Sequence, residues 1–436
     1  MLIFKSTVNL ELFFTKFYMN FKKDQQFYKF CAYGFLKNLR FFEPFLILFL
    51  LDEGLSFLEI GLLYSFREIV KNIFEIPAGI IADITGRKNC MLLSFSFYML
   101  SFVGYYFSNS FGWFSVSIMI FGLGDTFRTG THKAMIYDYL SFRGWTDYKV
   151  QYYGYTRSWS QLGSALSALI ATAIVIFTKN YRAIFIFSII PYLLDFINLA
   201  SYPRFLNGEQ MLFKNNYLMF KFKSKSIIKE FIQSFKNKNN LKAILSSSSY
   251  GAYYGILKDL LQPVLKTLAL AIPVFISLKP EQRSAIVIGA TYFIIYILTS
   301  IASRNSSRIS SRFKTMAKPV NISLLLGLGF GLIAGLLYNQ KLLLISVICY
   351  LIVLIIENIR KPVNMAYIAT VNKKEVLTSV LSVESQFKAI FIMVLGPALG
   401  ILADKYGLGI GIALISIFLL ILFPLFKLKS LIKKTA

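Results

Sequence analysis

The chain has 436 residues, of which 56% are hydrophobic and 17% aromatic, and its formal net charge is +26. A soluble domain does not need this much apolar surface, so the composition indicates an all-α protein that crosses the lipid bilayer several times. In a soluble chain the basic excess would suggest nucleic-acid binding. Here the basic residues fall between apolar segments, and we therefore expect no nucleic-acid partner.

Apolar runs long enough to span about 30 Å of hydrocarbon, roughly 20 residues each, predict twelve membrane helices. The segments are 28–51, 56–82, 88–107, 113–140, 151–178, 181–201, 243–278, 284–303, 318–338, 341–370, 377–403 and 408–427. Segment 243–278 is long for one crossing and contains Pro263 and Pro273. It therefore predicts a kink or an extension beyond the membrane.

Basic residues recur after every second predicted helix, which fixes the expected orientation. They are Arg87 and Lys88, Arg143 and Lys149, the Lys-rich stretch 202–242, Arg304 with Arg308 and Arg312, Lys373 with Lys374, and the run after Lys427. Because cytoplasmic loops are enriched in Lys and Arg, these connections are predicted to be cytoplasmic. We expect a plasma or inner membrane protein whose two tails, 1–27 and 428–436, are cytoplasmic. Residues 1–27 lack the order of charged, apolar and small residues that is typical of a signal peptide.

The stretch 202–242 divides the helices into two bundles of six, 28–201 and 243–427, and the two bundles resemble each other. An acid-x-x-Arg pattern occurs as Asp125/Arg128 and again as Glu357/Arg360. Two further matches keep the same order: Gly163-Ser-Ala-Leu with Gly396-Pro-Ala-Leu, and Arg40–Pro44 with Asp259–Pro263. Such repeats are typical of secondary transporters, whose binding sites lie between the halves.

Charged residues inside the apolar segments are the candidate substrate- or proton-binding residues, because ionised groups are costly in a membrane. The candidates are Asp125, Arg128, Glu43, Arg40, Glu357, Arg360, Asp259, Lys258 and Arg157. Acid and base three residues apart also neutralise each other on one helix face, so the pairs have a purely structural alternative. The same two alternatives hold for Glu68 and Lys71. Arg157 either binds an anionic group or extends to the interface.

Metal, disulfide and cofactor sites are not expected. Cys31, Cys90 and Cys349 are far apart in the chain, and His132 is the single histidine. This pattern offers no metal-ligand spacing, and it argues against a membrane enzyme, which would need a nucleophile, a metal cluster or an acid–base set.

The sequence from Gly79 to Lys88, GIIADITGRK, resembles the signature loop of the major facilitator superfamily, although Ile84 replaces a usual basic residue. The resemblance implies two six-helix bundles, alternating access, and a conformational latch with helix 377–403 formed by Gly79, Asp83, Gly86, Arg87 and Lys88. The alternative is that Arg87 and Lys88 only determine topology. A related sequence, Gly400-Ile-Leu-Ala-Asp404-Lys-Tyr-Gly407, follows helix 377–403.

We therefore expect a monomeric secondary transporter of a small solute. The resemblance favours proton coupling, as symport or antiport, and Asp125, Glu43 or Glu357 are the candidate proton carriers. The basic residues favour an anionic or zwitterionic solute, unless their acidic neighbours neutralise them. The alternatives are a polytopic membrane enzyme and a receptor or scaffold that transports nothing.

Overall fold

The computed structural model describes residues 23–208, 238–372 and 374–429, and the elements in these ranges are helices. Most of the predicted tails and of the 202–242 linker therefore lie outside the described residues. The N-terminal half contains α2 (Gln25–Leu36), α3 (Leu46–Asp52), α4 (Phe57–Thr85), α5 (Arg87–Phe107), α6 (Phe111–Arg128), α7 (Thr131–Phe142), η1 (Thr146–Tyr148), α8 (Lys149–Thr178), α9 (Ala183–Ala200) and η2 (Arg204–Asn207). The C-terminal half contains α11 (Lys238–Ala271), α12 (Pro280–Ser311), α13 (Ala317–Asn339), α14 (Leu343–Val371), α15 (Lys374–Tyr406), α16 (Leu408–Ile421) and α17 (Phe423–Phe426).

Every predicted apolar segment coincides with helix in the structure. Among the described residues, seven helices are long and apolar enough to cross a membrane, and α16 is a shorter apolar helix. The long segment 243–278 is α11, whose 34 residues end at Ala271, before Pro273. At 1.5 Å per residue this helix is about 50 Å long, which exceeds the roughly 30 Å of a hydrocarbon core, and Pro263 lies within it.

Three predicted helices are interrupted, which the apolar runs did not indicate: 408–427 is divided into α16 and the short α17, and the other two breaks lie in the N-terminal half. The first, 28–51, is broken between Leu36 and Leu46. Pro44 has no backbone N–H and disfavours helical geometry at Glu43, and the Asn38 side chain donates to the carbonyl of Gly34 at 2.6 Å. The break exposes backbone groups near Glu43 that a straight helix would use internally.

The second interruption divides the predicted helix 113–140 into α6 and α7. Gly130 lies between them with φ +79°, a left-handed conformation that glycine adopts without steric cost. As a result α7 begins as a new helix at Thr131, and the backbone N–H groups of its first turn have no partners within the helix.

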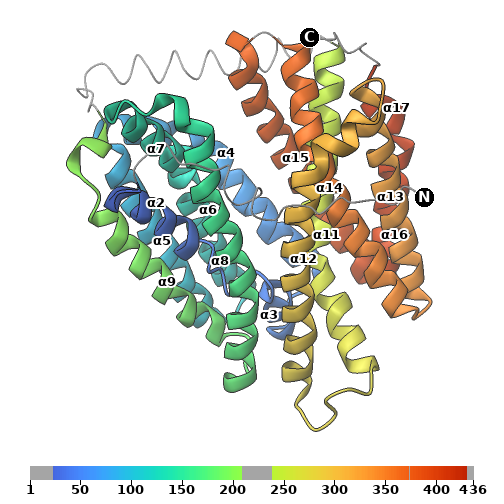
Figure 1. Ribbon diagram of the computed structural model, residues 1–436. Helices are drawn as coiled ribbons and strands as arrows, with labels where there is room; N and C mark the ends of the chain where they lie inside the picture. The colour runs from blue at the N-terminus through green and yellow to red at the C-terminus, as the bar shows by residue number, and fades with distance from the viewer. Residues whose placement is uncertain (1–22, 209–237, 373, 430–436) are drawn as a thin grey trace, which may run out of the picture.

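The two halves touch at one end of the molecule and spread apart toward the other. Figure 1 shows them meeting near α3 and diverging toward α7 and α17, and we call these the α3 end and the α7 end. α4 and α15 form the main contact, where Gly61 packs against the backbone of Gly396 and Gly400 against that of Phe57. A Cβ on Gly61 would lie 2.6 Å from the carbonyl oxygen of Gly396, so glycine permits this close approach.

Candidate functional site

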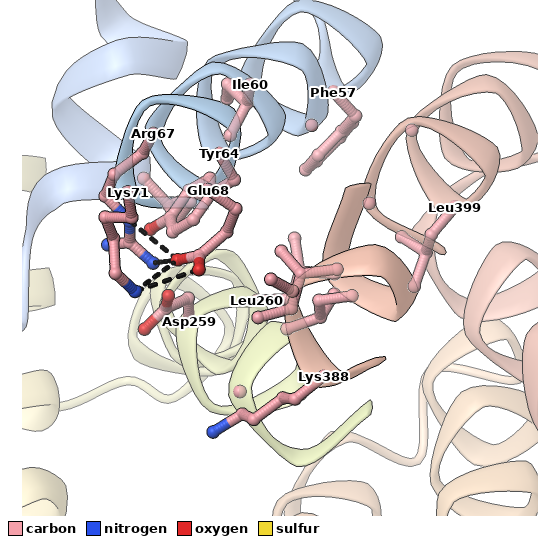
Figure 2. Close-up of a pocket in the computed structure, with 18 of the residues that line it drawn as sticks. Phe57, Ile60, Tyr64, Arg67, Glu68, Lys71, Asp259, Leu260, Lys388 and Leu399 are labelled. Carbon is pink, nitrogen blue, oxygen red and sulfur yellow. Dashed lines mark hydrogen bonds and ion pairs between the residues drawn. The ribbon is translucent and has the colours of Figure 1, made fainter. Parts of the chain in front are cut away.

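A cavity of about 260 Å³ lies between the two halves, with α4 on one side and α11 and α15 on the other. Its polar lining consists of Tyr64, Arg67, Glu68, Lys71, Asp259 and Lys388, together with Ser385. Apolar residues such as Ile60 and Leu260 complete the wall (Figure 2). A mostly apolar cavity with a few charged groups is the usual form of a small-molecule site.

The α4 side of the cavity carries an ion-pair cluster. The Nζ of Lys71 lies 2.8 Å from Oε2 of Glu68, and the guanidinium of Arg67 lies 3.1 Å from Oε1. Glu68 is buried, with 4% of its surface exposed, so both cations stabilise a carboxylate that would otherwise be costly. The cluster keeps one surplus positive charge. Glu68 and Lys71 therefore form the predicted pair, and both also line the cavity.

The other two walls each contribute one charge. Asp259 comes from α11 and Lys388 from α15, and neither has an ion pair within 4.0 Å to another residue of the described ranges. Figure 2 shows these two side chains coming from different helices than the α4 cluster. The cavity thus offers a carboxylate and an ammonium group to a bound molecule, in addition to the surplus charge of α4.

Glu43, Arg40 and Lys258 form a separate cluster that joins the halves. Lys258 of α11 donates to the carboxylate of Glu43, and Arg40 lies 3.8 Å from the same carboxylate. Gln262 strengthens this contact: its amide donates to the Glu43 carbonyl and accepts from the Ile47 N–H, both at 2.9 Å. The break between α2 and α3 makes these backbone groups available.

The two acid-x-x-Arg pairs are each contained within one half. Asp125 and Arg128 are 3.3 Å apart, and the hydroxyl of Tyr98 donates to Asp125 at 2.6 Å and accepts from Arg128 at 2.8 Å. Neither residue lines the cavity between the halves. Arg128 instead lines a second cavity together with Arg157.

In the C-terminal half, Glu357 and Arg360 are 3.7 Å apart. Arg360 donates to the hydroxyl of Ser246 at 2.8 Å and lies over the ring of Tyr250. Only 2% of Arg360 is exposed, so it is a buried part of the packing between α14 and α11. The repeat seen in the sequence thus corresponds to equivalent ion pairs with different surroundings.

Three residues of the predicted latch, Gly86, Arg87 and Lys88, contact their own half in this conformation. Arg87 forms an ion pair with Asp138 of α7. Gly86 has φ +91° and packs against Asn207, whose side-chain oxygen accepts from the backbone N–H of Lys88 at 3.0 Å. The Lys88 ammonium donates to the carbonyls of Ala200 and Tyr202. The signature sequence therefore anchors the start of α5 to the end of α9.

One of the nine candidate site residues, Asp259, lines the cavity between the halves. Arg67 and Lys388, which also line it, were not among the candidates. A signal existed, because α4 carries Arg67, Glu68 and Lys71 inside an apolar run. No group of three metal-ligating side chains occurs among the residues described, and the three cysteines are buried thiols.

Comparison with known proteins identifies the family. The chain matches the Major Facilitator Superfamily over residues 30–383. It is 24% identical over 415 residues to the uncharacterized MFS-type transporter YxaM of Bacillus subtilis strain 168, covering 93% of this chain and 96% of that protein. The chain belongs to the Major Facilitator Superfamily and is a multi-pass secondary transporter of small molecules.

Solved transporter structures share the fold at low sequence identity. A variant of the nucleoside transporter NupG aligns with a TM-score of 0.73 at 15% identity, covering 92% of this chain and 98% of that one. A bacterial homologue of the human lysosomal transporter Spinster, in an inward-facing and occupied conformation, aligns with a TM-score of 0.67 at 12% identity, covering 93% and 97%. These alignments define the architecture and leave the substrate to be argued from this chain's own residues.

Proposed function

We propose that this transporter moves a small zwitterionic solute by alternating access through the cavity between α4, α11 and α15. The observation that supports the proposal is the presence in that cavity of two opposite charges, Asp259 on one helix and Lys388 on another, that form no ion pair within 4.0 Å with residues of the described ranges. A solute with an amine and a carboxylate would place its amine at Asp259 and its carboxylate at Lys388, in a cavity that Arg67 and Lys71 also line. Each contact would be a charge-assisted hydrogen bond, which is stronger than a neutral one.

The conformation described is closed at the α3 end by polar contacts between the halves. Lys258 bonds Glu43, Gln262 bonds the backbone around Glu43, and Lys266 lies 2.9 Å from Asp52. If the basic loops are cytoplasmic, as the charge distribution predicts, the closed α3 end faces outward and the structure is inward-facing. Alternating access then requires these contacts to break while the α7 ends of the two halves approach each other.

We further propose that protons are coupled to this movement through Glu43. Its carboxylate is bound by Lys258 of the opposite half in this conformation, and opening of the α3 end would separate the two groups. A nearby ammonium changes the affinity of a carboxyl group for protons, so separating the halves links proton exchange to conformation. Asp125 and Glu357 stay candidates, but their arginine partners belong to the same half and move with them.

The proposal is tested with the full chain. A panel of metabolites is first screened for thermal stabilisation of the purified protein, and the stabilising solutes are then followed as fluxes in reconstituted vesicles with and without a pH gradient. We expect zwitterions to stabilise the protein and to be transported. A solute that binds without crossing the membrane would favour a receptor, and one that is chemically changed would favour a membrane enzyme.

A further inference from the structure

A second cavity, of about 230 Å³, is lined by residues of the N-terminal half. It is enclosed by α2, the junction of α6 with α7, and the first part of α8. Its charged lining consists of Lys37, Arg128, Lys133 and Arg157, and no acidic residue lines it. Four cations, from three helices and from the residue that follows α2, therefore line one cavity, and Lys133 and Arg157 among them are exposed.

The neutralisation of these cations is incomplete. Arg128 forms an ion pair with Asp125, in which a guanidinium nitrogen lies 3.3 Å from a carboxylate oxygen. Lys37 and Arg157 have no ion pair with any residue in the described ranges, and Lys133 lies over the rings of Tyr137 and Tyr153 at 5.5 and 5.4 Å. Lys37 is only partly exposed, and the acidic groups whose charge acts on it are Asp125 and Asp195, neither of which lies within ion-pair distance of it.

The backbone adds to the positive potential of this cavity. α7 is a 12-residue helix that begins after Gly130, and no side chain caps its first turn. Both Gly130 and residues of this first turn, His132 and Lys133, line the cavity. The free N–H groups and the helix dipole at such a terminus favour a bound anion.

We propose that this cavity binds a phosphate group, either free or as part of a phosphate ester. Arg128 and Arg157 would contact its oxygens with their planar guanidinium groups, and Lys37 would neutralise it from α2. The residues that line this cavity differ from those that line the proposed transport cavity. The phosphate comes from a soluble anion or from a lipid headgroup, and the test distinguishes the two.

Binding of radiolabelled inorganic phosphate and of glycerol phosphate to the purified full chain tests the proposal, at constant ionic strength set with chloride. We expect saturable binding that Lys37→Gln and Arg157→Gln each weaken by about ten-fold or more, the loss of one charge-assisted contact. Lys37→Arg should retain binding. Lys318→Gln, which removes an exposed lysine from α13 in the other half, is the matched control and should change nothing.

A second arm uses nanodiscs that contain phosphatidic acid or only phosphatidylcholine. Phosphatidic acid that stabilises the protein, with the same dependence on Lys37 and Arg157, would identify a lipid headgroup as the ligand. The proposal is overturned if neither phosphate source binds, or if Lys318→Gln weakens binding as much as the cavity variants do. Arg157 is exposed on α8, so its variant folds even if the Lys37 variant is unstable.

Discussion

Asp404 at the end of α15 caps the beginning of α4 in the opposite half. Its two carboxylate oxygens accept hydrogen bonds from the backbone N–H groups of Phe57, at 2.9 Å, and Leu58, at 2.8 Å. These groups have no partners within the helix, and a negative charge at a helix N-terminus is favoured by the helix dipole. The contact therefore stabilises the closed α3 end.

This contact gives the repeated sequence a structural meaning. The segment Gly79–Gly86 lies at the end of α4, and the segment Gly400–Gly407 lies at the end of α15. Both segments begin with the pattern Gly-x-x-Ala-Asp. α4 and α15 are the helices that pack across the interface. We propose that Asp83 approaches the start of α15 in the opposite conformation, as Asp404 approaches the start of α4 in this one.

Replacing Asp404 by Asn should shift the conformational equilibrium toward opening at the α3 end. Loss of a capping carboxylate costs about 1 kcal/mol, which corresponds to about a five-fold change in population. Distances between spin labels on the two halves would measure it. Lys405→Gln, at the exposed neighbouring position, is the control and should leave the distances unchanged.

Asp83→Asn should shift the equilibrium in the other direction, because it would weaken the proposed contact at the α7 end. Cross-linking between cysteines in α4 and α15 reports this conformation. An unchanged cross-linking pattern together with normal transport would leave Arg87 and Lys88 as determinants of topology alone.

Substitutions of Asp125 and Arg128 distinguish a structural role of this ion pair from a functional one. Asp125→Asn or Arg128→Gln alone leaves an unpaired, partly buried charge and should destabilise the fold by about 1–3 kcal/mol, while the double variant should recover most of this loss. The free energy of unfolding measures the first effect. If the pair also handles protons, the double variant folds but its transport no longer responds to a pH gradient. If the pH gradient drives uptake by the double variant as it does in wild type, the pair has a role in folding only. The same comparison applies to Glu357→Gln with Arg360→Gln.

The orientation follows from the basic loops and is tested by labelling. Cysteines introduced at Lys223, in the linker, and at Asn339, at the end of α13, should react with impermeant reagents from opposite sides of the membrane. Reaction of both from one side would contradict the arrangement of two six-helix bundles.

The apolar runs predicted the helices because hydrophobic length is a local property, whereas the site depends on contacts between distant residues. Arg40 was the predicted partner of Glu43, but the structure adds Lys258, 215 positions further along the chain. Lys388 could not be assigned to the cavity because its position there depends on the rotation of α15 against α4. The breaks at Pro44 and Gly130 had local signals, since proline and glycine are the residues that interrupt helices.

Solute flux through vesicles containing the wild-type chain, Asp259→Asn, Lys388→Gln or the control Lys405→Gln tests whether the cavity between the halves binds the transported solute. We expect wild type and Lys405→Gln to transport a zwitterion. Asp259→Asn and Lys388→Gln should fold and insert but each lose at least about ten-fold of the uptake rate, since each removes one charge-assisted contact to the solute. Undiminished uptake by both cavity variants would contradict the assignment of the site to the cavity between α4, α11 and α15.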